Sequence, residues 1–483
     1  MGTGYDLIVV GGGPAGSTLA TLVAKDGNRV LLLERDRFPR YQIGESLLPA
    51  TIHGICPLLG VEDEIRRAGF PVKLGGTFRW GKDGQFWSLY FGNCVAGTEE
   101  AAADRSHAYQ VRRSDFDSIL LKNAAKNGVE VREGNTVLDL LSSDDRITGV
   151  RFRDEAGHGQ TATARFVADA SGHQGGVASR IGERIPSKFY RNIGVYCYFE
   201  HGGRLPGKDA GNTLFEAFDG GWLWYIPLSD TLTSVGAVVE QRHAPALKGD
   251  REAAMRSFID ACPVTRGFLA GARRCEGEPY GGLRVRKEFS YCHTRFWAPG
   301  AVLVGDSACF IDVLLSSGVH LATYSALLAA RSINTCLAGD LDEGPSFDEF
   351  EMRYRLEFSR FYQLLVGLYD MRKDGETYHT WLRTWLRQTN GALLEPAELQ
   401  AQHQVRPMAG LFALLSGQVL PVSTTRALEE FREFNRRILQ NDGSHLTMDE
   451  VEPLPCAAWE LEPSASGLRW RDCNQADTPA AAR

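Results

Sequence analysis

The segment from Tyr5 to Glu34 constrains the fold more than any other part of the chain. Residues 5–10 (YDLIVV) form an apolar run that predicts a buried β-strand. The sequence GGGPAG at 11–16 follows directly, and residues 17–25 have the pattern of a helix. A second apolar run at 29–33 ends at Glu34. This order predicts a complete βαβ unit with an acidic residue after its second strand.

The glycines of this G-x-G-x-x-G motif predict a dinucleotide site. Gly11 permits a tight turn, Gly13 lets the backbone approach a pyrophosphate, and Gly16 lets the helix pack closely on the strand. The helix N-terminus offers free N–H groups to phosphates, and Glu34 is placed to accept hydrogen bonds from an adenosine ribose. A Gly-rich turn can serve packing alone, but here every part of the unit occurs in the expected order. The motif itself does not choose between FAD and NAD.

Composition and charge narrow the class of protein. The chain has 483 residues, 43% of them hydrophobic and 23% charged, and a net charge of −7, so no general basic field for nucleic acid is expected. The ten cysteines contain no C-x-x-C pair, which argues against a disulfide framework or a metal site and fits a reducing cytosol. Met1 leads directly into the first strand, and no apolar run reaches about eighteen residues. We therefore expect a cytoplasmic protein without a signal peptide or membrane span.

Two further stretches separate this chain from other dinucleotide-binding proteins. Residues 222–227 read WLWYIP, and strand alternation puts Trp222 and Trp224 on one face, which by itself is typical of a core. Residues 70–75 read FPVKLG and place Lys73 in an apolar setting, although most lysines are solvated. With the glycine motif, these stretches resemble the bacterial FAD-dependent halogenases over about residues 5–340. The W-x-W-x-I-P stretch is the rarest of the three motifs and discriminates most.

The resemblance implies an α/β fold of the flavin-monooxygenase type, with a Rossmann-like FAD-binding domain, a substrate-side mixed β-sheet and a helical C-terminal region. The expected boundaries are 1–185 for the first part of the FAD-binding domain with a strand meander at 129–168, 186–295 for the substrate-side sheet, 296–340 for the return to the FAD-binding domain, 341–462 for the helical region and 463–483 for a flexible tail.

The resemblance also implies roles for individual residues. Lys73 corresponds to the essential lysine of the family, and Gly44-Glu45-Ser46 to the strap that links the flavin and lysine regions. Ser316-Ser317-Gly318 matches the halide corner, where helix N-terminal amides suit an anion. Val313 departs from the family, which usually has proline after the loop aspartate. The implied cofactor-binding residues are Gly11, Gly13, Ala15, Gly16, Glu34, Glu45, Ser46, Arg113, Asp306 and Gly318, and the implied halide-binding residues are Ser317 and Gly318.

The implied reaction has two stages at separate places. Reduced FAD from a separate flavin reductase reacts with O₂ to give a flavin hydroperoxide, which oxidises a halide, chloride by default, to hypohalous acid. Lys73 then binds the hypohalous acid by hydrogen bonding or forms a haloamine. Both roles need a compact amine whose pKa falls on desolvation, not a guanidinium. Trp222 and Trp224 keep the substrate away from the flavin.

The substrate is inferred from the branch that the chain resembles. The Gly-Glu-Ser stretch, residues 316–320 and the helical C-terminus resemble the branch that acts on phenols or pyrroles carried by acyl or peptidyl carrier proteins. We expect a phenolic, polyketide-derived ring and a role in natural-product (antibiotic) biosynthesis. Basic residues between Arg353 and Arg387 form either a docking face for an acidic carrier protein or a solvated helix face. The alternatives are an aromatic hydroxylase of the same fold, a prenyl-chain reductase and a non-catalytic flavin-binding protein.

Overall fold

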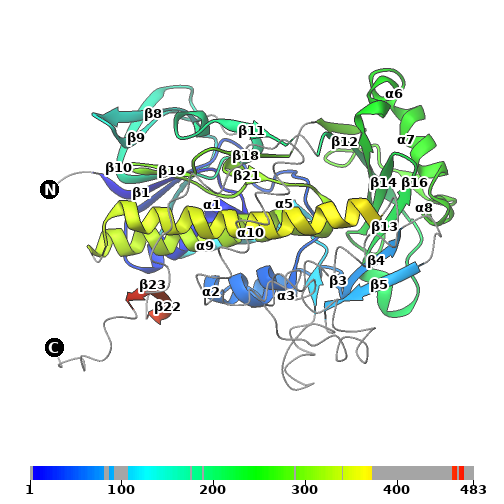
Figure 1. Cartoon of the computed structure of the whole chain (residues 1–483), viewed down its shortest axis with the longest axis horizontal. Coiled ribbons are helices and arrows are strands. Elements are labelled where there is room, and N and C mark those ends of the chain that lie inside the picture. Colours follow the sequence, from blue (N-terminus) through cyan, green and yellow to red (C-terminus); the bar gives the residue numbers. More distant parts are fainter. Residues whose placement is uncertain are drawn as a thin grey trace.

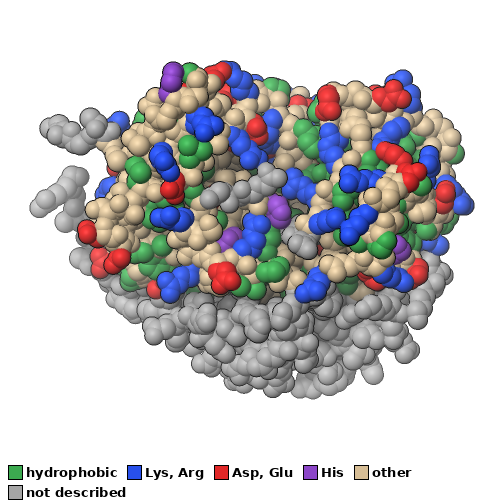
Figure 2. All heavy atoms as spheres, turned by 90° about the horizontal axis from the view of Figure 1, so that it is seen from above, with side chains coloured by type: hydrophobic (Ala, Val, Ile, Leu, Met, Phe, Trp, Pro, Cys, Tyr) green, Lys and Arg blue, Asp and Glu red, His purple; other side chains and the backbone are tan. Residues whose placement is uncertain are grey.

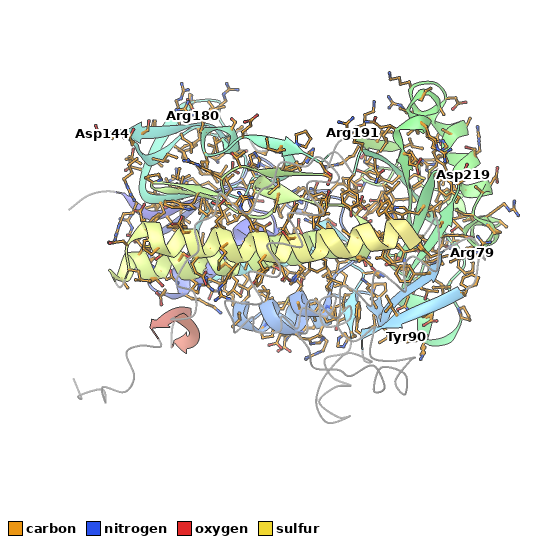
Figure 3. The ribbon with its side chains drawn as sticks, viewed as in Figure 1. Arg79, Tyr90, Asp144, Arg180, Arg191 and Asp219 are labelled. Carbon is orange, nitrogen blue, oxygen red and sulfur yellow. The ribbon has the colours of Figure 1, made fainter. Side chains whose placement is uncertain are left out.

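The computed structural model describes residues 4–80, 86–91, 107–174, 177–187, 190–287, 290–339, 341–371, 459–464 and 467–472. Its two large sheets lie at opposite ends of an elongated molecule, and two long helices run between them (Figure 1). Asp144 and Arg180 mark one end, whereas Arg79 and Asp219 mark the other (Figure 3).

The first sheet contains the predicted βαβ unit. Its strand order is β19-β20-β10-β1-β2-β7, with β8 and β9 attached to one end of β10. Five of its strands run parallel: β1, β2, β7, β10 and β20. Parallel strands are usually buried on both faces, and all four residues of β2 are buried apolar side chains. The bounds are β1 Tyr5–Val10, β2 Val30–Leu33, β7 Glu130–Arg132, β8 Thr136–Ser143, β9 Arg146–Arg153, β10 Gly159–Asp169, β19 Trp297–Ala298 and β20 Ala301–Leu303.

The stretch 129–168, expected as a strand meander, contains β8, β9 and β10 after the short parallel strand β7. Strands β8, β9 and β10 pair antiparallel, and the second half of β10 continues into the parallel sheet beside β1. Helix α1 (Pro14–Lys25) begins with proline, whose fixed φ suits the first helical position. Helix α5 (Arg113–Lys126) packs beside it.

The second sheet is mixed, as expected, with the order β16-β12-β15-β14-β13-β4-β5 and β17 paired to β12. Among the described strands of this sheet, β4 and β13 are the one pair that runs parallel. Strands β4 and β5 precede residue 186, so this sheet extends beyond the boundaries 186–295. The bounds are β4 Gly75–Arg79, β5 Phe86–Tyr90, β12 Asn192–Glu200, β13 Thr213–Phe218, β14 Gly221–Pro227, β15 Leu232–Glu240, β16 Arg273–Arg274 and β17 Arg284–Lys287.

Both faces of β14 are buried, and its successive side chains belong to two separate hydrophobic clusters. Trp222 and Trp224 belong to the large core that continues into the first sheet. Leu223 and Tyr225 point to the other face and pack in a separate cluster with the short helices of this end. Those helices are α6 Ala244–Lys248, α7 Arg251–Asp260 and α8 Pro263–Leu269.

Helices α9 (Ser317–Ala338) and α10 (Glu343–Met371) lie side by side along the molecule (Figure 1). The C-terminal end of α10 reaches the second sheet, where the Leu368 carbonyl accepts a hydrogen bond from Trp80. None of the described helices is both long enough and apolar enough to cross a membrane. Of the expected helical region 341–462, the structure describes residues 341–371, which belong to α10 and the two residues before it, and residues 459–462, which belong to a β-strand and not to a helix.

The remaining α-helices and strands are short. They are α2 Cys56–Leu59, α3 Glu62–Arg67, β3 Val72–Lys73, β6 Ala108–Tyr109, β11 Arg184–Pro186, β18 Tyr291–His293, β21 Cys309–Phe310, β22 Trp459–Ser464 and β23 Gly467–Asp472. A flexible tail was expected at 463–483, but β22 and β23 pair as an antiparallel hairpin. The rest of that tail lies outside the described residues.

Candidate active site

A cavity of about 550 Å³ runs from the glycine motif to the second sheet. Sites for cofactors and other small molecules commonly have about 300–1,000 Å³. The structure brings most of the implied site residues to its wall: Gly11, Gly13, Ala15, Glu34, Glu45, Ser46, Arg113, Trp224, Asp306 and Gly318. Four other implied residues are not among those that line the cavity: Gly16, Lys73, Trp222 and Ser317.

The glycines at the dinucleotide end differ in what they permit. Gly11 has a left-handed φ of +103°, and a Cβ on Gly16 would lie 1.9 Å from the Gly11 carbonyl oxygen. These two glycines are therefore required by the fold itself. A Cβ on Gly13 would meet the Arg40 Nη2 atom at 3.5 Å, an ordinary contact, and Gly13 faces the cavity. The space beside Gly13 fits a pyrophosphate at the start of α1.

Glu34 is held rigidly at the edge of the same cavity. Its Oε2 atom accepts a hydrogen bond from the Gly12 N–H at 2.6 Å, and Oε1 accepts one from the Asp36 N–H at 2.8 Å. A carboxylate has about four lone-pair sites, so Glu34 can also accept from ribose hydroxyls. The residues present thus fit the adenosine half of FAD.

Arg113 and Arg40 share one buried acidic partner, Asp117. Arg113 donates to both carboxylate oxygens at 2.7 and 2.9 Å, and also to the carbonyls of Ile43 and Gly44. Arg40 donates to Asp117 at 2.8 Å. Arg113 therefore holds the strap in place as well as lining the cavity. Sequence reasoning missed Arg40, whose place beside Gly13 suits phosphate binding.

Glu45 is the buried acid of the strap. Burial raises the pKa of its carboxyl to about 7, against the lowering effects of Ser234, Tyr198 and Arg113. The Tyr198 hydroxyl donates to Glu45 at 2.8 Å and lies 2.7 Å from the Tyr41 hydroxyl. Neither tyrosine was expected at the site, because single tyrosines in a strand and a loop carry no local signal.

Asp306 follows β20 and lines the cavity at the carboxyl end of the first sheet, where ligands of open α/β sheets bind. Burial raises the pKa of Asp306 to about 6, although Arg113, Arg286 and Arg184 lower it. Its acceptor oxygens suit the hydroxyls of a ribityl chain. The neighbouring turn is fastened by Asp169, which accepts a hydrogen bond from Ser307 at 2.9 Å.

Lys73 is buried at 3% exposure and lies between the strap and the start of α9. Its ammonium donates to the Leu47 carbonyl at 2.9 Å and to the Ser316 hydroxyl at 3.2 Å, and lies over the Phe91 ring. Burial lowers the pKa of Lys73 to about 7. Among the described residues no carboxylate forms a salt bridge with Lys73, so burial is the cause of the lowered pKa.

The expected halide corner has an uncommon backbone. Leu315 and Ser316 both have left-handed φ values, +67° and +62°, and neither is glycine. Such residues cost about 1–3 kcal/mol each and persist only where surrounding contacts hold them. Ser316 and Gly318 line the cavity, whereas the Ser317 side chain is 1% exposed and begins α9. Ser316, rather than Ser317, therefore stands between Lys73 and the cavity.

The two tryptophans of β14 do not have equal access to the cavity. Trp224 lines it, and its indole donates to Ser234 at 3.2 Å. Trp222 is fully buried behind it, with ring centroids 6.1 Å apart, and donates to Tyr369 at 2.8 Å. The face formed by Trp224 is thus the aromatic boundary between the cavity and the second sheet.

Comparisons with known proteins identify the family of this chain. The family model described as tryptophan halogenase matches residues 6–105 and 97–414. A tryptophan 2-halogenase of Chondromyces crocatus is 34% identical over 77% of this chain and 69% of the relative. The flavin-dependent halogenase armH4 of Armillaria mellea is 31% identical over 77% of this chain and 73% of the relative.

Solved structures show the same fold over most of the chain. The myxobacterial chondrochloren halogenase CndH is 49% identical with a TM-score of 0.74, covering 88% of this chain and 99% of that one. The flavin-dependent halogenase CmlS is 30% identical with a TM-score of 0.70, covering 91% of this chain and 78% of that one. The α/β fold class predicted from the sequence is confirmed, and the chain belongs to the FAD-dependent halogenase family.

Proposed function

We propose that the enzyme halogenates an electron-rich phenolic ring of polyketide origin, carried by an acyl or peptidyl carrier protein. One observation carries the chemical part of the proposal. Lys73 is buried, has a lowered pKa without a carboxylate partner, and bonds to Ser316 at the cavity wall. A lysine in this setting offers a neutral amine near pH 7, which an exposed lysine does not.

The roles of the residues follow from their positions. Bound FAD, reduced by a separate flavin reductase, supplies the oxidising chemistry that converts halide and O₂ to hypohalous acid. Gly13, Glu34 and Arg40 hold the adenosine and phosphate groups, and Asp306 accepts from the ribityl chain. Ser316 and Gly318 mark the halide corner at the start of α9. Lys73 receives the hypohalous acid on the far side of Ser316.

The boundary at Trp224 supports halogenation over hydroxylation. A hydroxylase of this fold needs its aromatic substrate beside the flavin, so that oxygen is transferred directly. Here the bulky indole of Trp224 forms the wall of the cofactor cavity, with Trp222 packed behind it. A hydroxylase also gives no role to the buried Lys73. Chloride or bromide should therefore be required for any aromatic product.

The choice of a phenolic substrate over tryptophan is supported by the degree of sequence identity to two halogenases. The chondrochloren halogenase is 49% identical, whereas the tryptophan 2-halogenase is 34% identical. Docking of a carrier protein through the expected basic cluster needs revision, because Arg355 is buried and bonded to Glu351. The part of that cluster from Arg372 onward lies outside the described residues. Figure 2 shows Lys and Arg side chains on another face, around the hollow between the two ends of the molecule.

The test supplies reduced FAD from a separate reductase, O₂ and chloride or bromide, and follows products by mass spectrometry. Three substrates are compared: a phenolic acyl group on its carrier protein, the same phenolic acid free, and free L-tryptophan. We expect one halogen to replace one hydrogen, and the carrier-bound phenol to react far faster than the free acid. Equal rates for the carrier-bound and free phenol would show that no carrier protein is needed. Faster reaction of L-tryptophan would show that the substrate is tryptophan and not a phenol. A hydroxylated product formed without halide would contradict the proposed halogenation.

A further inference from the structure

A buried cluster of hydrogen bonds joins the end of α10 to the loop before the halide corner. The Tyr369 hydroxyl donates to Asp312 Oδ2 at 3.0 Å and accepts from Trp222 Nε1 at 2.8 Å. Asn192 donates to the same hydroxyl at 3.0 Å and lies 3.4 Å from Asp312 Oδ2. All four side chains are less than 9% exposed.

The direction of each hydrogen bond in this cluster follows from its partners. An indole N–H can only donate, and the amide nitrogen of Asn192 also donates, so both lone pairs of the Tyr369 hydroxyl are used. The hydroxyl proton must then point at the Asp312 carboxylate. Phenylalanine would fill the same space but would leave buried polar groups of Trp222, Asn192 and Asp312 without this partner, which is costly.

Asp312, held by Tyr369, in turn binds the backbone of the loop that leads to the halide corner. Its Oδ1 atom accepts from the Leu314 N–H at 2.9 Å, and the Val313 N–H also stabilises the carboxylate. A proline at 313 could not donate in this way. The next two residues, Leu315 and Ser316, have left-handed backbone, and Ser316 accepts from Lys73. The carboxylate thus fixes the segment just before a strained turn that leads into α9.

We propose that Tyr369, supported by Asn192, is a positioning residue that holds Asp312 and thereby keeps residues 314–318 in the geometry for halide binding. This inference rests on the proposed function and adds to it that α10 supplies part of the active site. Tyr369 does not itself line the cavity, whereas its partner Asp312 does, so Tyr369 acts through Asp312. A proline at position 313 would restrict the loop backbone directly; with Val313 at that position, the hydrogen bond from Tyr369 to Asp312 restricts the loop instead.

The test is Tyr369→Phe with Tyr362→Phe as the matched control. Tyr362 lies two turns earlier on α10 and is also buried, but its hydroxyl lies 3.3 Å from Ser187 and outside the Asp312 cluster. For Tyr369→Phe we expect the KM for chloride or bromide to rise about tenfold, as the loss of a hydrogen bond to a charged group implies. FAD affinity should stay unchanged, and less halogenated product should form per reduced FAD consumed.

Hydrogen exchange gives a readout that does not depend on turnover. Backbone amides at 313–318 should exchange faster in Tyr369→Phe than in the wild type and unchanged in Tyr362→Phe. Asn192→Leu should give the same pattern with a smaller change, and it serves as the second variant if Tyr369→Phe folds poorly. If the wild type forms no halogenated product, the proposed function fails, but the exchange pattern still decides the role of Tyr369. Unchanged exchange and halide KM, or equal losses in the control, would overturn the inference.

Discussion

Replacement of Lys73 tests the chemistry of the site most directly. Burial lowers the pKa of Lys73 to about 7 from an ordinary 10.5. At pH 7 about half of the amine is then neutral, against roughly 0.03% for an ordinary lysine, a gain of about 10³ in the nucleophilic form. Lys73→Ala removes this amine, and Lys73→Arg replaces it with a guanidinium that stays charged at any working pH.

Both variants should lose the aromatic product and keep the flavin chemistry. Because Lys73 lies behind the cavity wall, FAD binding, flavin reoxidation by O₂ and halide oxidation should be largely intact in Lys73→Ala. Product should fall more than a hundredfold, which corresponds to about 2.7 kcal/mol. An exposed ion pair contributes only about 0–1 kcal/mol, so a lost surface charge could not explain such a loss. Lys126→Ala, at a lysine with an exposed side chain, is the matched control.

The assay measures halogenated product by mass spectrometry together with peroxide release and the rate of flavin reoxidation. These quantities separate the substrate step from the oxidation steps in one reaction mixture. Substantial halogenated product from Lys73→Ala would refute the role of Lys73, even though the fold and the family are established. Loss of FAD binding in the same variant would instead assign Lys73 a structural role.

Three further predictions concern other parts of the site. If Lys73 reacts as the neutral amine, product formation at constant halide oxidation should rise as pH increases through about 7, and a fall would indicate the ammonium form. Gly13→Val should abolish FAD binding without lowering the melting temperature of the apoprotein, whereas Gly16→Val should fail to fold, because its Cβ would lie 1.9 Å from a carbonyl oxygen. Gly318→Val should increase peroxide release and decrease halogenation, because its Cβ would press on Phe310 at 3.1 Å. Unaffected halogenation in Gly318→Val would place the halide elsewhere.

Local patterns were sufficient for the elements that carry a periodic or motif signal. The apolar run, glycines and acid between Tyr5 and Glu34 follow the order typical of a βαβ unit, and the structure has that unit. Alternation in WLWYIP placed Trp222 and Trp224 on one face, as found. It could not show that Trp222 lies behind Trp224, because that depends on how α10 approaches β14.

Long-range contacts define the rest of the site, and sequence patterns do not contain them. The hydrogen-bond partners of Lys73, Leu47 and Ser316, lie 26 and 243 positions away in the chain. Lys73 is therefore buried because three distant segments of the chain meet around it, and the local sequence FPVKLG could not show this. Tyr369 belongs to an aromatic stripe at helical spacing, which is typical of a packed core. Only the tertiary structure shows that its hydroxyl bonds to Asp312.

The absence of a salt bridge to Lys73 among the described residues has a chemical consequence. A paired carboxylate would hold the lysine charged throughout the reaction, but here burial alone sets its pKa. An anion held at the halide corner would favour the ammonium form and raise the pKa of Lys73 for as long as it is bound. Oxidation of that halide to neutral hypohalous acid removes the anion and with it this stabilisation. The pKa of Lys73 then returns to about 7, so the neutral amine becomes available when the electrophile forms.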